Sequence, residues 1–291
     1  LEGAVGAAYL AEQSDAEQLT PAIIAEILRD LPVSRAGEMV ALPALKRVAV
    51  TKLHEPDEIF HLPMAGYLGV DIGSVSTDLA VIAANGELIS SVYLPTRGRP
   101  VEVLKEGLAI IKSRFAGGLK VLGCGTTGSG RHLAGKILGA DIVKNEITCQ
   151  FLGIQHYFDD IDTIFEIGGQ DSKFISVRDN CVSDFLMNKV CAAGTGSFLE
   201  EQAAEMGIDI IGEFEELAFA GLSPADLGSH CTVFMETEVC NALQQGKDLA
   251  DICAGLAYSI VRNYLEKVVG NRPIGKKVAF QGGVASNSAV V

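Results

Sequence analysis

Short runs of hydrophobic residues, separated by polar and glycine residues, predict three strands between residues 67 and 94. Residues 67–70 form an apolar run that suits a buried strand. Residues 77–84 continue as a second strand, and residues 87–94 return as a third. The Asn85-Gly86 pair between the last two is a strong signal for a two-residue hairpin turn. The segment therefore predicts a strand, a short turn and an immediate β-hairpin.

The same arrangement occurs a second time in the chain. Residues 163–167 predict a strand, and residues 173–177 and 182–186 predict two more around an Asp179-Asn180 turn. Two such units with helices between them predict an α/β fold of two similar lobes with a cleft between them. The other predicted elements are helices at 100–115, 129–138, 147–158, 196–206, 213–220, 236–245 and 248–269, and strands at 119–124 and 277–280.

The N-terminal residues follow a different pattern. Residues 1–11 are rich in small residues and predict a helix, and residues 14–31 predict another, with Pro21 in its first turn. We therefore expect residues 1–11 to be a separate terminal helix, residues 12–65 a linker or small appended element, residues 66–165 a first lobe and residues 166–291 a second lobe.

Composition narrows the class of protein. A chain of 291 residues that is 48% hydrophobic has ample core for two lobes. Its net charge of −14 argues against nucleic acid and anionic membrane surfaces as partners, because both would repel it. The chain has no run of about twenty apolar residues and no basic segment typical of a signal peptide. Seven scattered cysteines do not suggest a disulfide framework, so we expect a cytoplasmic protein.

The turn after the first strand has the chemistry of a phosphate site. Gly73 lets the backbone approach an anion closely, and Ser74 and Thr77 add hydroxyl donors. Asp71 lies at the mouth of this turn, where a carboxylate would repel phosphate unless a cation lay between them. Asp71 therefore suggests a ligand of Mg²⁺ or of its water shell. A plain hairpin remains the alternative, since short motifs of this kind are common.

A second turn of similar composition follows the strand that ends at Glu166. Gly168, Gly169 and Gln170 come directly after this strand. Paired with the first turn, it would form two backbone cradles that clamp a nucleotide polyphosphate and its Mg²⁺. The simpler interpretation of Gly168-Gly169 is a tight turn.

The order of these motifs resembles a known superfamily. Asp71-Ile72-Gly73, Asn145-Glu146, Glu166-Ile167-Gly168-Gly169 and Gly282-Gly283 occur in the order found in the actin, sugar-kinase and heat-shock-chaperone ATPases. Within that superfamily, residues 69–78, 167–173, 191–200 and 231–239 resemble the activators of 2-hydroxyacyl-CoA dehydratases and the related benzoyl-CoA reductase ATPase subunits. The resemblance covers about residues 66–291, and the blocks that contain cysteine are its most specific part.

The resemblance implies roles for individual residues. Asp71 would hold the Mg²⁺ water shell, and Ser74 and Thr77 would contact phosphate. Glu146 would orient the attacking water and Glu166 would lie near the metal. Glu146 is also explained as a carboxylate favoured at a helix start. The cofactor implied is ATP/ADP with Mg²⁺, and the glycines that would let the backbone approach the adenosine are Gly282 and Gly283.

Two cysteines carry the redox part of the resemblance. Cys191 and Cys231 each precede a predicted helix, and neither has a CxxC neighbour. In the activators, two matching cysteines from each of two subunits hold one [4Fe–4S] cluster, which implies a homodimer. The remaining cysteines are expected to be small buried hydrophobic residues: Cys124, Cys149, Cys181, Cys240 and Cys253.

The resemblance thus implies an ATPase that acts as an ATP-dependent reductive activator in an anaerobe. Its partners would be a ferredoxin- or flavodoxin-like electron donor and an iron–sulfur enzyme such as a 2-hydroxyacyl-CoA dehydratase. Two alternatives remain open, a small-molecule or sugar kinase of the same superfamily and a nucleotide-responsive scaffold without redox activity. The resemblance also implies a fragment of a longer, tandem-repeat activase. In such a protein, residues 1–11 would be the terminal helix of a preceding repeat, and the second lobe, 166–291, would be truncated at its C-terminal end.

Overall fold

The computed structural model describes residues 41–51, 62–188 and 192–291. The helices predicted at 1–11 and 14–31, and Cys191, lie outside these residues. Both sheets described below belong to one compact unit, residues 40–291. None of the described helices is long and apolar enough to cross a membrane.

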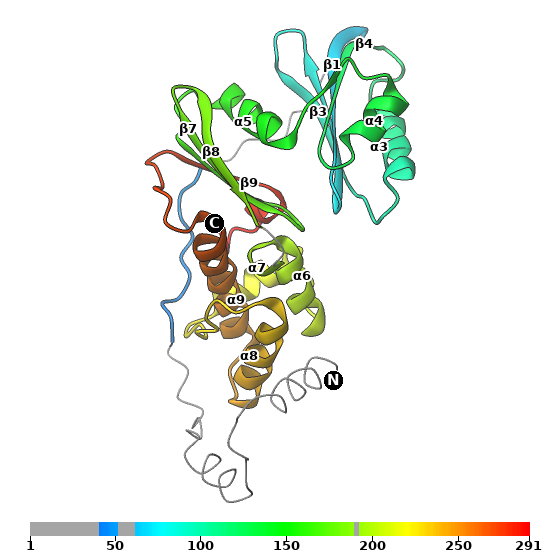
Figure 1. The fold of residues 1–291 in the computed structure, drawn as a ribbon. Coiled ribbons are helices and arrows are strands. Elements are labelled where there is room, and N and C mark those ends of the chain that lie inside the picture. The colour runs from blue at the N-terminus through cyan, green and yellow to red at the C-terminus, as the bar shows by residue number, and fades with distance from the viewer. Residues whose placement is uncertain (1–40, 52–61, 189–191) are drawn as a thin grey trace, which may run out of the picture. The chain divides into compact units, whose positions relative to one another are not determined.

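The first sheet has five strands in the order β3-β2-β1-β4-β5. The hairpin strands run antiparallel to β1, whereas β4 runs parallel to it after a helical crossover. Helices α3 and α4 lie beside this sheet (Figure 1). The bounds are β1 (Met64–Ile72), β2 (Ser76–Ala83), β3 (Leu88–Pro95), α3 (Pro100–Arg114), β4 (Leu119–Thr127), α4 (Arg131–Leu138) and β5 (Ile142–Val143).

The first core forms on one face of this sheet because alternate residues of its strands are apolar. Leu68, Val70 and Ile72 of β1 are all buried on that face. They pack with Leu104 of α3 and Ala134 of α4. The opposite face carries Asp71 at the end of β1, since side chains alternate along a strand. Burial therefore fixes the direction in which Asp71 points.

The second sheet repeats the layout of the first, in the order β8-β7-β6-β9. Again a hairpin runs antiparallel to the opening strand, and the next strand is parallel to it. Helix α5 packs on this sheet through Ile147 and Phe151, against Ile164 and Ile175. The bounds are α5 (Glu146–Tyr157), β6 (Thr163–Ile167), β7 (Ser172–Arg178), β8 (Cys181–Met187) and β9 (Val278–Gln281).

Helices form most of the second half of the chain. The longest, α9, is buried along most of its length, and Tyr264 at its end stacks edge-on against Phe165 of β6. The Tyr264 hydroxyl donates to the backbone carbonyl of Lys173 on β7 (2.7 Å). The bounds are η1 (Ala192–Gly194), α6 (Gly196–Glu205), α7 (Glu213–Ala220), α8 (Thr232–Gln244), α9 (Leu249–Tyr264), a π-helical turn η2 (Leu265–Val269) and η3 (Gly283–Ser286).

Most predicted elements agree with the structure to within two residues. Strand β4 continues to Thr127, three residues beyond the predicted end at residue 124. Helix α8 begins at Thr232, four residues earlier than expected, and the short strand β5 was missed.

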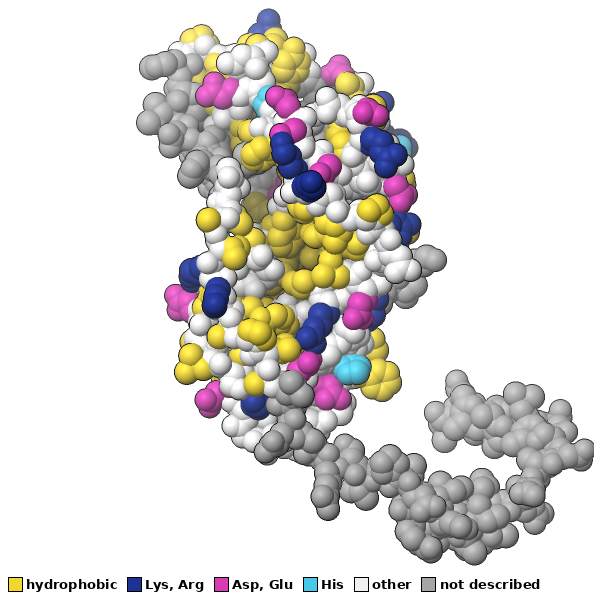
Figure 2. Space-filling view, turned by 90° about the vertical axis from the view of Figure 1, so that its left-hand side faces the viewer, with side chains coloured by type: hydrophobic (Ala, Val, Ile, Leu, Met, Phe, Trp, Pro, Cys, Tyr) yellow, Lys and Arg dark blue, Asp and Glu magenta, His cyan; other side chains and the backbone are white. Residues whose placement is uncertain are grey.

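On the surface, acidic and basic side chains are interspersed around a hollow lined by hydrophobic side chains (Figure 2).

Candidate functional site

The two turns predicted to bind phosphate are built alike. Each lies between two antiparallel strands that begin to pair at corresponding positions, Ile72 with Thr77 and Ile167 with Ser172. In the first turn, the Gly73 N–H donates to the Ser76 carbonyl (2.8 Å). In the second, the Gly168 N–H donates to the carbonyl three residues later (2.9 Å). The repeat suggested by the sequence is thus a repeat of backbone geometry.

The turns also contact each other. A Cβ placed on Gly169 would lie 2.6 Å from Cγ2 of Val75 in the first turn, so only glycine fits this position without rearrangement. The second turn is held from behind by the start of α6, where the Gly196 N–H donates to the Gly168 carbonyl (2.8 Å). The Ser197 N–H donates in the same way to the Gly169 carbonyl (2.7 Å).

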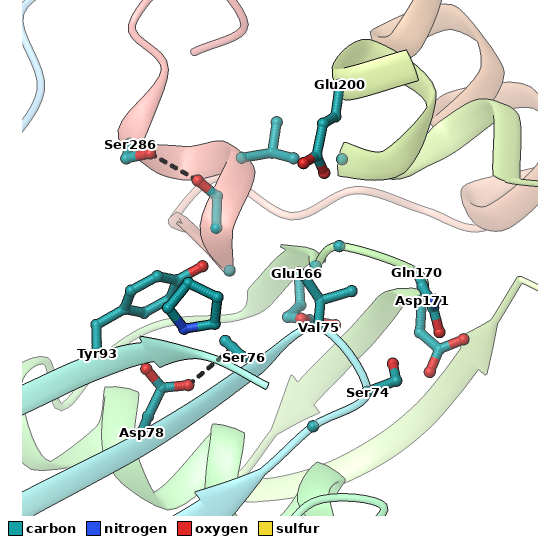
Figure 3. Close-up of a pocket in the computed structure, with 18 of the residues that line it drawn as sticks. Ser74, Val75, Ser76, Asp78, Tyr93, Glu166, Gln170, Asp171, Glu200 and Ser286 are labelled. Carbon is teal, nitrogen blue, oxygen red and sulfur yellow. Dashed lines mark hydrogen bonds between the residues drawn. The ribbon is translucent and has the colours of Figure 1, made fainter. Parts of the chain in front are cut away.

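Both turns line one cavity of about 850 Å³. Figure 3 shows Ser74 and Val75 of the first turn beside Glu166, Gln170 and Asp171 of the second. The volume lies within the range of small-molecule and cofactor sites. Every predicted catalytic or nucleotide-binding residue except Thr77 lines this cavity: Asp71, Gly73, Ser74, Glu146, Glu166, Gly168, Gly169, Gln170, Gly282 and Gly283.

Thr77 differs from the prediction because its side chain points into the protein. It is fully buried, and its hydroxyl lies 2.9 Å from that of Thr96. The Thr96 hydroxyl donates in turn to the Gly73 carbonyl (3.0 Å). Thr77 therefore supports the first turn from inside and does not line the cavity. The strand alternation explains this, since Thr77 lies on the same face as Leu79.

A third loop completes the site and was missed in the sequence. Gly128 has φ +82°, and a Cβ at this position would lie 2.2 Å from Oδ1 of Asp71 and 2.5 Å from the Ile72 carbonyl oxygen. The Gly130 N–H donates to that same carbonyl (2.8 Å), and Ser129 lines the cavity. The run of glycine and hydroxyl residues from 125 to 130 was the available signal.

We expect Gly128→Ala to weaken nucleotide binding, because the added methyl group must displace the Asp71 carboxylate or the β1 backbone. A suitable control is Gly98→Ala, which has a similar φ of +68° but open space around the added methyl group. The control should lose about 1 kcal/mol of stability from backbone strain and keep its affinity for MgADP. Calorimetric titration and thermal unfolding of both variants measure this, and equal affinities would contradict the close packing of Gly128 on Asp71.

Carboxylates and one ammonium group meet at the floor of the cavity. Lys173 Nζ lies 2.7 Å from Glu166 Oε2 and 3.4 Å from Glu146 Oε1. Burial and the neighbouring Glu146 carboxylate raise the pKa of Asp71, and the Lys173 ammonium partly opposes them. Burial alone would lower the pKa of Lys173, but the Glu166 and Glu146 carboxylates outweigh it and raise that pKa. Lys173 is therefore charged, and the carboxylates exceed it in number.

Asp78 is a further acidic residue that lines the cavity. It lies directly opposite Asp71 in the β1–β2 ladder and accepts a hydrogen bond from the Ser76 hydroxyl (2.9 Å). Burial raises the pKa of Asp78 from its ordinary value of 3.8 to about 6, with a smaller contribution from Asp71 and against the Ser76 hydrogen bond. The corresponding residue of the second turn, opposite Glu166, is Lys173. The two turns thus have the same backbone geometry but differ in charge at this position.

The raised pKa of Asp78 predicts a pH-dependent stability. The folded protein favours the protonated form of the Asp78 carboxyl. The contribution of this group to the free energy of unfolding is therefore fully present below about pH 4 and is lost as the pH rises through about 6. Asp78→Asn should therefore be more stable than the parent at pH 8, by about 1–2 kcal/mol, and no more stable at pH 4. Thermal unfolding at both pH values tests this. The exposed Asp159→Asn serves as control, and an equal gain at both pH values would contradict the prediction.

The opposite wall of the cavity comes from the end of the second sheet. Gly282 has φ +90°, and a Cβ there would lie 2.4 Å from the Ile167 carbonyl oxygen, so glycine is required. A Cβ on Gly283 would meet nothing within 4 Å. Gln281 of β9 hydrogen-bonds through its side chain to Gln150 of α5, which also lines the cavity.

Cys231 lies outside the cavity. It is half-buried at the N-cap of α8, and the residue predicted to act with it, Cys191, lies outside the described residues. Within the part of the chain that the structure describes, no group of three or more His, Cys, Asp and Glu side chains is placed to hold a metal ion. The expectation that the other cysteines are buried is right for Cys253 and wrong for Cys181 and Cys240, which are exposed.

The two lobes, their equivalent turns and the shared cavity define an α/β ATPase of the actin-like class. A family model, the BadF/BadG/BcrA/BcrD ATPase family, matches residues 68–291, and the chain belongs to this family. The chain is 33% identical over 232 residues to the (R)-2-hydroxyglutaryl-CoA dehydratase activating ATPase of Acidaminococcus fermentans. The matched segment covers 77% of this chain and 84% of that protein. The chain is also 33% identical over 234 residues to the 2-hydroxyisocaproyl-CoA dehydratase activator of Clostridioides difficile, covering 77% and 83%.

Solved structures agree with this assignment. Component A of the A. fermentans (R)-2-hydroxyglutaryl-CoA dehydratase superposes with a TM-score of 0.71 and 29% identity, over 78% of this chain and 86% of that one. The C. difficile activator, solved with bound ADPNP, gives a TM-score of 0.70 and 28% identity, over 78% and 83%. The predicted family, fold class and ATPase activity class are thereby confirmed.

Proposed function

We propose that this chain is an ATP-dependent activator that couples ATP hydrolysis to the transfer of a low-potential electron to an iron–sulfur enzyme. The observation that carries the proposal is the pair of equivalent turns around one cavity, with Asp71, Glu146 and Glu166 at its floor. Proteins named as dehydratase activators are similar to this chain over most of their length.

The nucleotide would bind between the two turns. In the first turn, backbone N–H groups and the Ser74 hydroxyl would contact the phosphates. In the second turn, Gly168, Gly169 and Gln170 would do the same. Mg²⁺ is usually held by one or two carboxylates, keeps several of its waters and takes other ligands from phosphate. Asp71 fits this requirement, because it lines the cavity beside the first turn and its neighbour Glu146 brings a second carboxylate close enough to add to the rise in its pKa that burial causes. Bound Mg²⁺ would neutralise the charge that develops on the phosphates.

Hydrolysis then requires a positioned water. Glu146 begins helix α5 at the cavity wall, and its partly exposed carboxylate is available to orient the water that attacks the terminal phosphate. Glu166 is more deeply buried and is paired with Lys173, so it suits a supporting role beside the metal. The backbone at Gly282 and Gly283 would accommodate the adenosine.

The electron-transfer part of the proposal rests on Cys231 and Cys191. Cys231 fits a cluster ligand by its place, since it is half-buried at the N-cap of α8 and lies outside the nucleotide cavity. Two chains would together supply four thiolates, which is the number that a [4Fe–4S] cluster needs. Such a cluster would store one low-potential electron. Rotation of the lobes on hydrolysis would change the dimer interface at the start of α8.

We infer the partners and the setting from the same reasoning. A ferredoxin- or flavodoxin-like protein would supply the electron, and an iron–sulfur acyl-CoA dehydratase or reductase would receive it. An exposed cluster would be sensitive to oxygen, so the setting would be the cytoplasm of an anaerobe. The first lobe would comprise residues 66–165 and the second residues 166–291.

The experiment is to purify the chain without oxygen and measure iron, acid-labile sulfide, oligomer mass and ATP hydrolysis in one preparation. We expect about two irons per chain in a dimer that hydrolyses MgATP. Iron-free protein that releases ADP only with a sugar would contradict the proposal and identify a kinase. Nucleotide binding with neither iron nor hydrolysis would identify a scaffold instead.

A further inference from the structure

Lys173 is the buried cation of the cavity floor, and its role does not follow from any of the sequence motifs. Lys173 is only 5% exposed. Its Nζ bridges two carboxylates, Glu166 at 2.7 Å and Glu146 at 3.4 Å. The first of these is its direct partner across the β6–β7 ladder. The second belongs to helix α5, which precedes the second sheet in the chain. The side chain of Lys173 therefore connects strand β7 to the start of helix α5.

The lysine is itself firmly positioned. The Tyr264 hydroxyl donates to its backbone carbonyl (2.7 Å), and the Tyr264 ring packs edge-on against Phe165, with centroids 5.2 Å apart. The ammonium also faces negative charge from Asp171 and Asp71. A buried ammonium in this position is stabilised by its carboxylate partners, and it can in turn fix the partner that is less buried.

Glu146 is that partner. Its side chain is 22% exposed, whereas those of Lys173 and Glu166 are 7% and 6% exposed. Glu146 is the first residue of α5, where the only side-chain cap is the one that Asn145 provides to the Thr148 N–H. Among the described residues, Lys173 is the one that holds the Glu146 carboxylate by an ion pair or hydrogen bond.

We propose that Lys173 is a positioning residue for ATP hydrolysis, whose ammonium holds the Glu146 carboxylate at the cavity floor where the attacking water binds. The inference rests on the proposed ATPase function and deepens it. Near the site of catalysis, a small displacement of an orienting group is costly, so loss of the ammonium should lower kcat more than it weakens nucleotide binding.

A double-mutant cycle tests this. Lys173→Met should lower kcat for MgATP hydrolysis about tenfold, with little change in KM or in MgADP affinity. In a Glu146→Gln background, measured under single-turnover conditions, the same substitution should cause less than about a twofold further loss, since its effect passes through Glu146. Lys112→Met, at an exposed position on α3, is the control and should match the parent.

The possible results distinguish a failure of the role of Lys173 from a failure of the proposed function. Equal losses in both backgrounds, or a loss of MgADP affinity with kcat preserved, would overturn the role of Lys173. Where Lys173→Met does not fold, Lys173→Arg provides the same cycle, because it keeps a charge beside Glu166 but moves the donors that face Glu146. No hydrolysis by the unmodified chain would instead contradict the proposed activator function, in which ATP hydrolysis drives electron transfer.

Discussion

Glu146→Gln should lower kcat for ATP hydrolysis by about 10²–10⁴-fold while leaving MgATP binding nearly unchanged. The amide keeps the shape of the side chain but loses the charge that orients and polarises the attacking water. It also loses the ion pair with Lys173. Steady-state hydrolysis together with calorimetric titration of MgADPNP separates the two effects.

The competing explanation for Glu146 is that a carboxylate simply favours a helix start. Glu102 offers a matched control, because it is an exposed carboxylate in the first turn of α3. If both residues act only on the helix dipole, each Gln substitution should cost about 0.3–1 kcal/mol of stability and leave kcat unchanged. Loss of activity confined to Glu146→Gln supports the catalytic role, and equal activity in the two variants would exclude it.

Cys231→Ser should abolish iron binding, from about two irons per chain to nearly none, because a cluster that lacks thiolate ligands is not retained. The matched control is Cys240→Ser. Cys240 is an exposed cysteine on the same helix, α8, so its loss removes a thiol without removing a proposed ligand. Iron and acid-labile sulfide are measured on anaerobically purified dimers of each variant.

The two cysteine variants also distinguish specific ligation from adventitious iron. We expect Cys240→Ser to keep the iron and the dimer, and Cys231→Ser to lose the iron while still binding MgADP, since Cys231 does not line the nucleotide cavity. Equal iron content in both variants would remove Cys231 from the site and with it the proposed cluster.

Much of the fold follows from patterns that are local in sequence. The apolar run at residues 67–70 located β1, and the Asn85-Gly86 turn located the hairpin after it. Helix α7 and strand β6 have the predicted bounds. The edge strand β5 was missed because two residues are too few to establish any periodicity. The early start of α8 was missed because Cys231 is a weak capping signal.

The site could be predicted where it lies in a turn, and not where it depends on contacts between distant elements. The glycines at 169 and 282 could be found because an added Cβ would lie 2.6 Å from Val75 and 2.4 Å from the Ile167 carbonyl oxygen, so the close approach of these turns requires glycine. Thr77 was assigned to the cavity because its hydroxyl lies in the turn, although strand alternation directs it inward. Lys173 was missed because its second partner, Glu146, lies in another element, at the start of helix α5.

The proposed coupling of ATP hydrolysis to electron transfer can be measured directly on the reduced chain. The measurement is the rate at which a low-potential viologen dye takes an electron from the anaerobic, reduced protein, with MgATP, with MgADPNP and without nucleotide. We expect MgATP to change this rate by about tenfold or more, and MgADPNP to leave it unchanged in the absence of hydrolysis. The same rate under all three conditions, in protein that hydrolyses ATP, would contradict the coupling.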